Sequence, residues 1–268
     1  MGILDAILLG VVQGLTEFLP ISSSGHLILA RDVLGLSGEG SLAFDAALHL
    51  ATALAIIWYF RVDIKKLVMT GYHWIRRQPT EQETLRLLIA ILIGSIPAVI
   101  AGVLFGDIIE AIFRSAFSVA GALIIGSIIM LFAESYRNKS NTPEPITKPH
   151  ALAVGFFQAL ALIPGMSRSG MTIAGGMLLG LTREQAARFT FLLALPVILG
   201  AGGMKFVELL SGTDASVGIA ALLLGCLAAF LSGLVAVWGL MKLLRRYSLV
   251  PFVIYRVLLA VIVLLVSF

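Results

Sequence analysis

Six apolar segments of the sequence are each long enough to cross the roughly 30 Å hydrocarbon core of a bilayer. Because the backbone finds no water there to bond to, a chain built from such segments has to fold as helices. A mean hydropathy of +1.02 and a charged fraction of only 13% also favour a membrane protein. We predict an all-α, polytopic membrane protein. The predicted spans cover residues 41–60, 85–105, 116–133, 186–205, 215–240 and 248–268.

Two further apolar segments, residues 3–36 and 151–181, are interrupted at their centres. The interruptions read LPISSSG in the first segment and IPGMSRSG in the second, so each combines Pro with Gly and Ser. The second apolar piece of each segment is too short to span a bilayer. We therefore predict two re-entrant helical hairpins, each entering and leaving the membrane on one side.

The two hairpins are copies of each other. A shift of 145 residues aligns Gly10 with Gly155 and Gln13 with Gln158, and 15 of the 45 positions in residues 10–54 are identical to their shifted partners. The matches include Gly, Ser, Gln and Glu, which an apolar composition does not produce by chance. We infer an internal duplication.

Three predicted spans lie between the copies, and an odd number gives the second copy the opposite orientation. The predicted organisation is a single membrane domain of two inverted repeats, residues 1–136 and 151–268, with a cytoplasmic linker at 137–150. In such folds broken helices meet near the middle of the bilayer, where their N-terminal ends can hold an anion.

The basic residues indicate the orientation. Of 19 Lys and Arg residues, 14 fall in segments that this topology places on one side: 61–86, 137–148, 183–188 and 242–246. Cytoplasmic segments carry an excess of Lys and Arg. We therefore predict that 61–86 is a cytoplasmic loop and that both termini and the mouth of the first hairpin lie outside. The net charge of +4 is interpreted as a topology signal, and no nucleic-acid partner is predicted.

Polar groups inside a membrane usually mark a functional site. An arginine can grip a phosphate through two parallel N–H bonds, and backbone N–H groups at helix starts form an anion cradle. Both hairpins supply such groups, so the sequence predicts one phosphate site formed by the two turns. The candidate residues are Glu17, Ser22, Ser23, Ser24, Gly25 and His26 in the first hairpin, and Ser167, Arg168, Ser169, Gly170 and Thr172 in the second. Gln13 is expected to support the site by bonding to loop backbone.

The roles within the first hairpin remain open at this point. Ser23 and His26 lie three positions apart on one helical face, a spacing that suits a hydroxyl nucleophile and an imidazole base. Glu17 can orient His26, activate a hydroxyl or a water, or bind a divalent cation. The alternative for Ser22, Ser23 and Ser24 is to cap a helix and fill close packing.

Other polar residues are interpreted more simply. Asp45 and His49 share one helical face near the outer end of the first span, where a supporting and a direct role are equally compatible with the pattern. Arg256 lies in mid-span and needs a partner, for which structural pairing is expected. Gln158, the repeat partner of Gln13, is not predicted to be catalytic. The single cysteine, Cys226, rules out an internal disulfide.

Two segments of the sequence are similar to those of a known family. QGLTEFLPISSSGH (13–26) and PGMSRSGMT (164–172) resemble the signature segments of the undecaprenyl-diphosphate phosphatases, the bacitracin-resistance type of integral membrane phosphatase. PFVIYR (251–256) is similar too, and the resemblance covers essentially the whole chain. It implies hydrolysis of undecaprenyl diphosphate to undecaprenyl phosphate and inorganic phosphate in the bacterial inner membrane. It also implies recycling of this carrier for cell-wall synthesis, and dependence on a divalent cation, Mg²⁺ or Ca²⁺.

The resemblance assigns roles to particular residues. It implies that Glu17 is the functional acid and candidate metal ligand, Ser23 the serine, His26 the histidine and Arg168 the phosphate-binding arginine, surrounded by Ser167, Ser169 and Thr172. Gln13 stands where many members have a glutamate, which argues against a mechanism with two ionised acids. The alternative of another class is a polyprenyl-phosphate flippase or secondary transporter, since inverted repeats with broken helices also build such proteins. A homodimer is left open.

Overall fold

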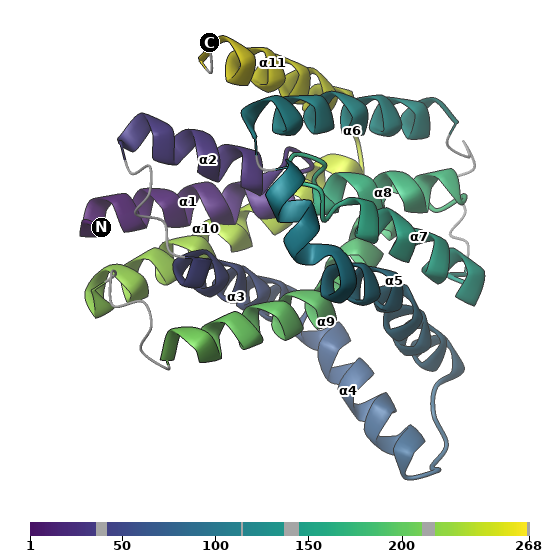
Figure 1. Cartoon of the computed structure of the whole chain (residues 1–268). Helices are drawn as coiled ribbons and strands as arrows, with labels where there is room; N and C mark the ends of the chain where they lie inside the picture. Colours follow the sequence, from purple (N-terminus) through teal and green to yellow (C-terminus); the bar gives the residue numbers. More distant parts are fainter. Residues whose placement is uncertain (36–41, 114, 137–144, 211–217, 267–268) are drawn as a thin grey trace.

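The computed structural model of the chain describes residues 1–35, 42–113, 115–136, 145–210 and 218–266. These residues form eleven α-helices and contain no β-strand (Figure 1). The helices are α1 Ile3–Phe18, α2 Ser23–Leu34, α3 Leu42–Tyr59, α4 Arg61–Ile75, α5 Gln82–Phe113, α6 Ala116–Tyr136, α7 Lys148–Leu160, α8 Arg168–Leu178, α9 Arg183–Leu210, α10 Ile219–Leu244 and α11 Val250–Val266. The all-α prediction is confirmed.

Four helices, α5, α6, α9 and α10, are long and apolar enough to cross a membrane. They correspond to four of the six predicted spans. α3 qualifies only together with α4, from which it is bent by 88°, and the apolar part of α11, Val250–Leu265, is shorter than the other spans. The protein therefore has the multi-pass character that its apolar segments predicted, with two spans shorter than expected.

The prediction of a loop at 61–86 is wrong for most of its length. Residues 61–75 form α4, whose Leu67 and Thr70 are buried while Val68 and Ile75 are exposed. α4 packs against the start of α5 (Figure 1). The prediction counted only the charges of this segment and overlooked the helical spacing of its apolar residues, which is what buries one face.

The helix contacts repeat as a duplication requires. If α7, α8, α9, α10 and α11 are taken as copies of α1, α2, α3, α5 and α6, then the contact of α1 with α10 corresponds to that of α7 with α5. Likewise, the contact of α3 with α10 corresponds to that of α9 with α5, and α1–α2 to α7–α8. Each hairpin thus packs on the other repeat. The inverted orientation of the repeats in a membrane stays a prediction.

Two glycines produce the same close approach in each repeat. A Cβ atom added at Gly10 would lie 2.2 Å from the carbonyl oxygen of Gly225 in α10, and one added at Gly155 would lie 2.4 Å from that of Gly94 in α5. Separations this small leave no room for a side chain, so glycine is required for α1 and α7 to touch their partner helices.

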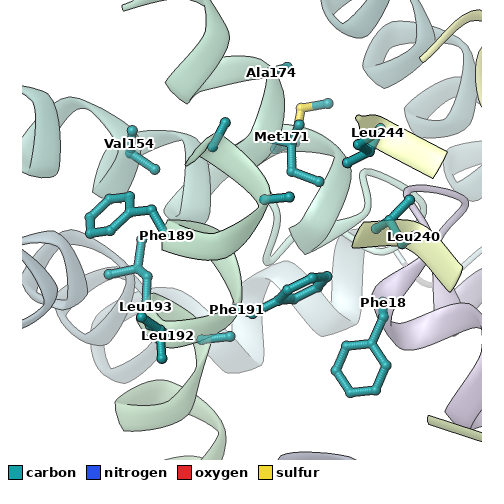
Figure 2. Packing of buried hydrophobic residues seen from close by; sticks show 14 of the residues in the cluster. Phe18, Val154, Met171, Ala174, Phe189, Phe191, Leu192, Leu193, Leu240 and Leu244 are labelled. Carbon is teal, nitrogen blue, oxygen red and sulfur yellow. The ribbon is translucent and has the colours of Figure 1, made fainter. Parts of the chain in front are cut away.

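The largest buried cluster joins both repeats. Phe18 at the end of α1 meets Phe191 of α9 edge to face, with ring centroids 5.6 Å apart. Met171 of α8 and Leu240 and Leu244 of α10 belong to the same cluster (Figure 2). α1 also contacts α8 directly, so the end of α1 lies next to the second hairpin turn.

Candidate active site

The two hairpins turn through matching backbone conformations. α2 begins at Ser23 and α8 at Arg168, each directly after a serine with positive φ, 75° at Ser22 and 72° at Ser167. A positive φ is uncommon for a residue other than glycine and costs on the order of 1–3 kcal/mol. Surrounding contacts therefore have to hold both serines in place.

Hydroxyl pairs support each turn from within. Ser22 Oγ lies 3.1 Å from Ser24 Oγ, and Ser167 Oγ lies 3.2 Å from Ser169 Oγ. Ser167 also caps α8, because its Oγ accepts a 3.1 Å bond from the backbone N–H of Gly170. The predicted helix starts after both turns are therefore present, with a side-chain cap at the second.

Two further bonds tie one turn to the other. The backbone N–H of Gly165 donates to Ser24 Oγ at 3.3 Å, and Ser169 Oγ donates to the carbonyl oxygen of Leu19 at 3.0 Å. Each bond runs from a serine of one hairpin to the backbone of the other. The turns thus form one unit although about 140 residues separate them in the sequence.

Glu17 is the point where the two motifs meet. Its Oε2 accepts bonds from Ser23 Oγ at 2.7 Å and Gln13 Nε2 at 3.0 Å, and His49 Nε2 lies 3.5 Å away. Its Oε1 accepts a 3.2 Å bond from Arg168 Nη1. The predicted meeting of the two hairpins is confirmed, because the arginine of the second reaches the acid of the first.

His26 does not pair with Ser23, contrary to the expectation from their spacing. Its Nδ1 lies 2.7 Å from the carbonyl oxygen of Ser22, and its Nε2 lies 2.8 Å from the hydroxyl of Tyr255 in α11. The hydroxyl of Ser23 turns to Glu17 instead. The first turn of α2 lies beside the end of α1, so the carboxylate is the nearer acceptor. Tyr255 was missed, since its partner lies 229 residues away in the sequence.

The predicted site residues differ in how far their side chains are exposed. The side chain of Arg168 is 25% exposed, and Ser23, Ser24 and His26 are also partly exposed, so a ligand can reach all four. Five other predicted site residues belong to the buried support of the turns. These are Ser22, Gly25, Ser167, Ser169 and Gly170.

Three predicted residues lie beside this centre. The hydroxyl of Thr172 donates to the carbonyl oxygen of Arg168 at 2.7 Å, within its own helix, so it is not directed at a ligand. Asp45 accepts a bond from Arg31, which ties α3 to α2. His49 places Nδ1 2.8 Å from the carbonyl oxygen of Asp45, and this contact directs Nε2 to Glu17.

Arg256 is fully buried, and its hydrogen-bond acceptors are neutral. Nη1 donates to the carbonyl oxygen of Pro20 at 3.5 Å, and Nη2 donates to that of Gly165 at 3.1 Å. The 145-residue shift aligns Pro20 with Gly165. Nε donates to Ser127 Oγ at 3.1 Å. One side chain therefore holds the same point of both turns, and the expected structural pairing is confirmed.

Glu17 and Gln13 are the residues of this centre whose oxygen atoms could contact a divalent cation. The amide oxygen of Gln13 is buried without a hydrogen-bond partner in the part of the chain that the structure describes, and it belongs to the side chain that already contacts Glu17. The same described part has no cluster of three His, Cys, Asp or Glu side chains. Mg²⁺ is commonly held by one or two carboxylates together with substrate phosphates. One carboxylate and one amide oxygen are therefore a suitable protein contribution.

Fold and site together define a class: an integral membrane protein whose polar centre combines an acid, a serine and an arginine where two broken helices meet. Residues 6–262 match the family model described as bacitracin resistance protein BacA. The chain therefore belongs to this family.

Named relatives are similar over nearly their full length. The undecaprenyl-diphosphatase of Alteromonas mediterranea is 41% identical over 266 residues, which cover 98% of each chain. The undecaprenyl-diphosphatase 1 of Pseudoalteromonas translucida is 41% identical over 97% of each chain. That of Myxococcus xanthus is 42% identical over 98% of this chain and 89% of the relative.

Proposed function

We propose that the protein hydrolyses undecaprenyl diphosphate to undecaprenyl phosphate and inorganic phosphate. This reaction returns the lipid carrier to cell-wall synthesis and gives resistance to bacitracin. Membership of the family and the names of the relatives support the reaction. The observation that carries the proposal is the chain of contacts Ser23–Glu17–Arg168, which joins a hydroxyl, an acid and a phosphate-binding cation from both hairpins.

Binding of the diphosphate uses groups from both turns. Arg168 can form two parallel N–H bonds with one phosphoryl group, and the N-terminal ends of α2 and α8 add oriented backbone N–H groups. In the structure Arg168 bonds to Glu17, which is the anion it faces before a substrate arrives. The diphosphate replaces this contact and leaves Glu17 to act on Ser23.

Glu17 is the proposed base for the first step. Ser23 Oγ already donates to Glu17 Oε2 at 2.7 Å, so its proton moves to the carboxylate while Oγ attacks the terminal phosphorus. A bond from Oγ to phosphorus forms, and the bond from phosphorus to the bridging oxygen breaks. Undecaprenyl phosphate leaves, and Arg168 balances the charge on the phosphoryl oxygens.

Water completes the reaction in the second step. It attacks the phosphoserine and its proton goes to His26, while Glu17 returns its proton to Ser23 Oγ. The bond from phosphorus to Oγ breaks, inorganic phosphate leaves, and His26 then releases its proton to water. A bound Mg²⁺ or Ca²⁺, held by Glu17 and the amide oxygen of Gln13, would supply charge neutralisation at the phosphates. Direct attack by a water that Glu17 activates is the competing mechanism.

Phosphate release tests the proposed function. Purified protein is incubated with undecaprenyl diphosphate in detergent, with and without a chelator, and Ser23→Ala serves as the matched inactive control. We expect phosphate release that the chelator suppresses and that the variant lacks. A folded wild-type protein that releases no phosphate from the lipid would overturn the proposal and leave a transporter as the better interpretation.

We further propose that the protein lies in the bacterial inner membrane with both termini and the mouth of the site outside. The division of the basic residues supports this orientation. In a Cys226→Ala background, an impermeant thiol reagent should label a cysteine at Asp107 from outside intact cells and a cysteine at Gln78 only after lysis. Labelling of both from the same side would contradict the orientation.

A further inference from the structure

The environment of His26 contains a residue to which no role has been given. Its two ring nitrogens have different partners: the carbonyl oxygen of Ser22 at Nδ1 and the hydroxyl of Tyr255 at Nε2. The rings of His26 and Tyr255 are nearly parallel, with an interplanar angle of 4° and centroids 5.6 Å apart. The phenol therefore contacts the imidazole through its ring as well as its hydroxyl.

The partners determine which nitrogen of His26 exchanges a proton. A carbonyl oxygen only accepts hydrogen bonds, so Nδ1 has to carry a proton to bond to Ser22. In the neutral imidazole Nε2 is then the acceptor, and the hydroxyl of Tyr255 donates to it. When Nε2 gains a proton, the same hydroxyl becomes the acceptor. Tyr255 is thus a partner that His26 keeps in both protonation states.

The position of Tyr255 is fixed relative to both turns. It directly precedes Arg256, which is fully buried and bonds to the carbonyl oxygens of Pro20 and Gly165. Tyr255 itself is 44% exposed. Exposed tyrosines are common in the interface belts of membrane proteins, where their hydroxyl groups meet water. Here the hydroxyl meets an imidazole nitrogen instead, which a belt position does not require.

We propose that Tyr255 relays the proton of the second step: its hydroxyl gives its own proton to Nε2 of His26, to which it is bonded, and takes the proton of the attacking water in exchange. The proposal deepens the proposed function and rests on it. Because Tyr255 acts through His26, it should affect turnover rather than binding of the diphosphate, for which Arg168 and the helix ends are responsible.

Tyr255→Phe tests the role, because it removes the hydroxyl and keeps the ring. We expect kcat to fall about tenfold, a part of the 10²–10⁴ that proton transfer commonly contributes, with KM within about twofold of wild type. Tyr247→Phe, which removes an exposed hydroxyl just before α11, is the matched control and should leave both constants unchanged. A kcat of Tyr255→Phe within twofold of wild type would overturn the proposal.

A double-mutant cycle with His26→Gln separates an action through His26 from a general loss of structure. In the His26→Gln background, Tyr255→Phe should have little further effect on the residual kcat. A full tenfold loss in that background would show that Tyr255 acts elsewhere and overturn the proposal.

Nitrogen NMR gives a readout that does not need activity. In protein labelled with ¹⁵N-histidine, His26→Gln assigns the His26 signals among the four histidines. Tyr255→Phe should move the Nε2 signal of His26 and leave those of His73 and His150 in place. An unmoved Nε2 signal would refute the contact even if kcat fell. If wild-type protein releases no phosphate while Tyr255→Phe still moves the Nε2 signal, the proposed function is refuted and the contact is retained.

Discussion

The two hairpin turns have nearly the same backbone and carry different chemistry. Both turn through a serine with positive φ, at Ser22 and Ser167, and both pair that serine with the hydroxyl two positions later. The next position starts a helix in each case, but it is Ser23 in the first turn and Arg168 in the second. The proposed nucleophile and the proposed phosphate-binding cation therefore occupy equivalent positions of the two turns.

Two other pairs of aligned positions carry a polar residue in the first hairpin and an apolar one in the second. The 145-residue shift aligns Glu17 with Leu162 and His26 with Met171. His26 faces a tyrosine hydroxyl, whereas Met171 lies in the buried apolar cluster (Figure 2). The second turn thus has one charged side chain, that of Arg168, beside hydroxyls that hold the turn. The first turn provides the acid that this arginine needs as a partner.

The difference between the two hairpin turns explains why one site needs residues from both. A partly buried cation needs an anion or many hydrogen-bond acceptors, and Arg168 finds its anion in the other repeat. If both turns carried the arginine, two cations would share one acid, Glu17, and the hydroxyl of Ser23 would be lost. Duplication therefore supplies the frame twice, and divergence of single positions supplies a complementary pair.

The largest expected effect comes from removing the hydroxyl of the first turn. Ser23→Ala should lower kcat by about 10³-fold or more, because no other hydroxyl is bonded to Glu17 in the described part of the chain. Ser22→Ala and Ser24→Ala should cost far less, since these hydroxyls hold the turns. Phosphate release from the lipid measures all three variants. Equal small losses would favour direct attack by water.

The second largest effect should come from the equivalent position of the other turn. Arg168→Lys keeps the charge but loses the planar fork, so we expect kcat/KM to fall by about 10²–10³-fold. Arg246→Lys, at the end of α10, is a matched control that should be silent. Near-normal phosphate release by Arg168→Lys would show that charge alone suffices.

The sequence predicted the frame well because the frame depends on local patterns. Apolar length gave the helices, the interruptions gave the two turns, and the shifted identities gave the correspondence between Ser22 and Ser167. The meeting of Arg168 with Glu17 was also predictable, because a mid-membrane arginine needs an anion and few acids were available.

The side-chain partners were less predictable. The spacing of Ser23 and His26 suggested a pair, yet each bonds to a residue outside this turn of α2. Such choices depend on which helix lies beside the side chain, which a single sequence does not state. Helix α4 was missed for a different reason: the charges of residues 61–86 were interpreted as a loop, although the spacing of the apolar residues in 61–75 forms a helix.

A smaller effect, on stability, should be equal in the two repeats. Gly10→Ala and Gly155→Ala each place a methyl group against a backbone carbonyl, so each should lower the free energy of unfolding by about 1–3 kcal/mol. Gly239→Ala is the matched control, because a Cβ at Gly239 meets nothing within 4 Å in the described structure. Thermal unfolding in detergent measures all three. Loss in only one repeat would break the correspondence of the two hairpins.

The smallest effect should come from the two bonds that cross between the turns. Ser24 accepts from the backbone of Gly165, and Ser169 donates to the backbone of Leu19, so each serine ties its own turn to the other. Removing one such bond typically costs about 1 kcal/mol, or about fivefold in a rate that depends on the contact. Ser24→Ala and Ser169→Ala should therefore each lower kcat/KM about fivefold. Because both bonds hold the same two turns, the double variant should lose more than the product of the single losses. Losses that simply multiply would mean that the two bonds act independently, and that other contacts, such as those of Arg256 with Pro20 and Gly165, hold the turns together.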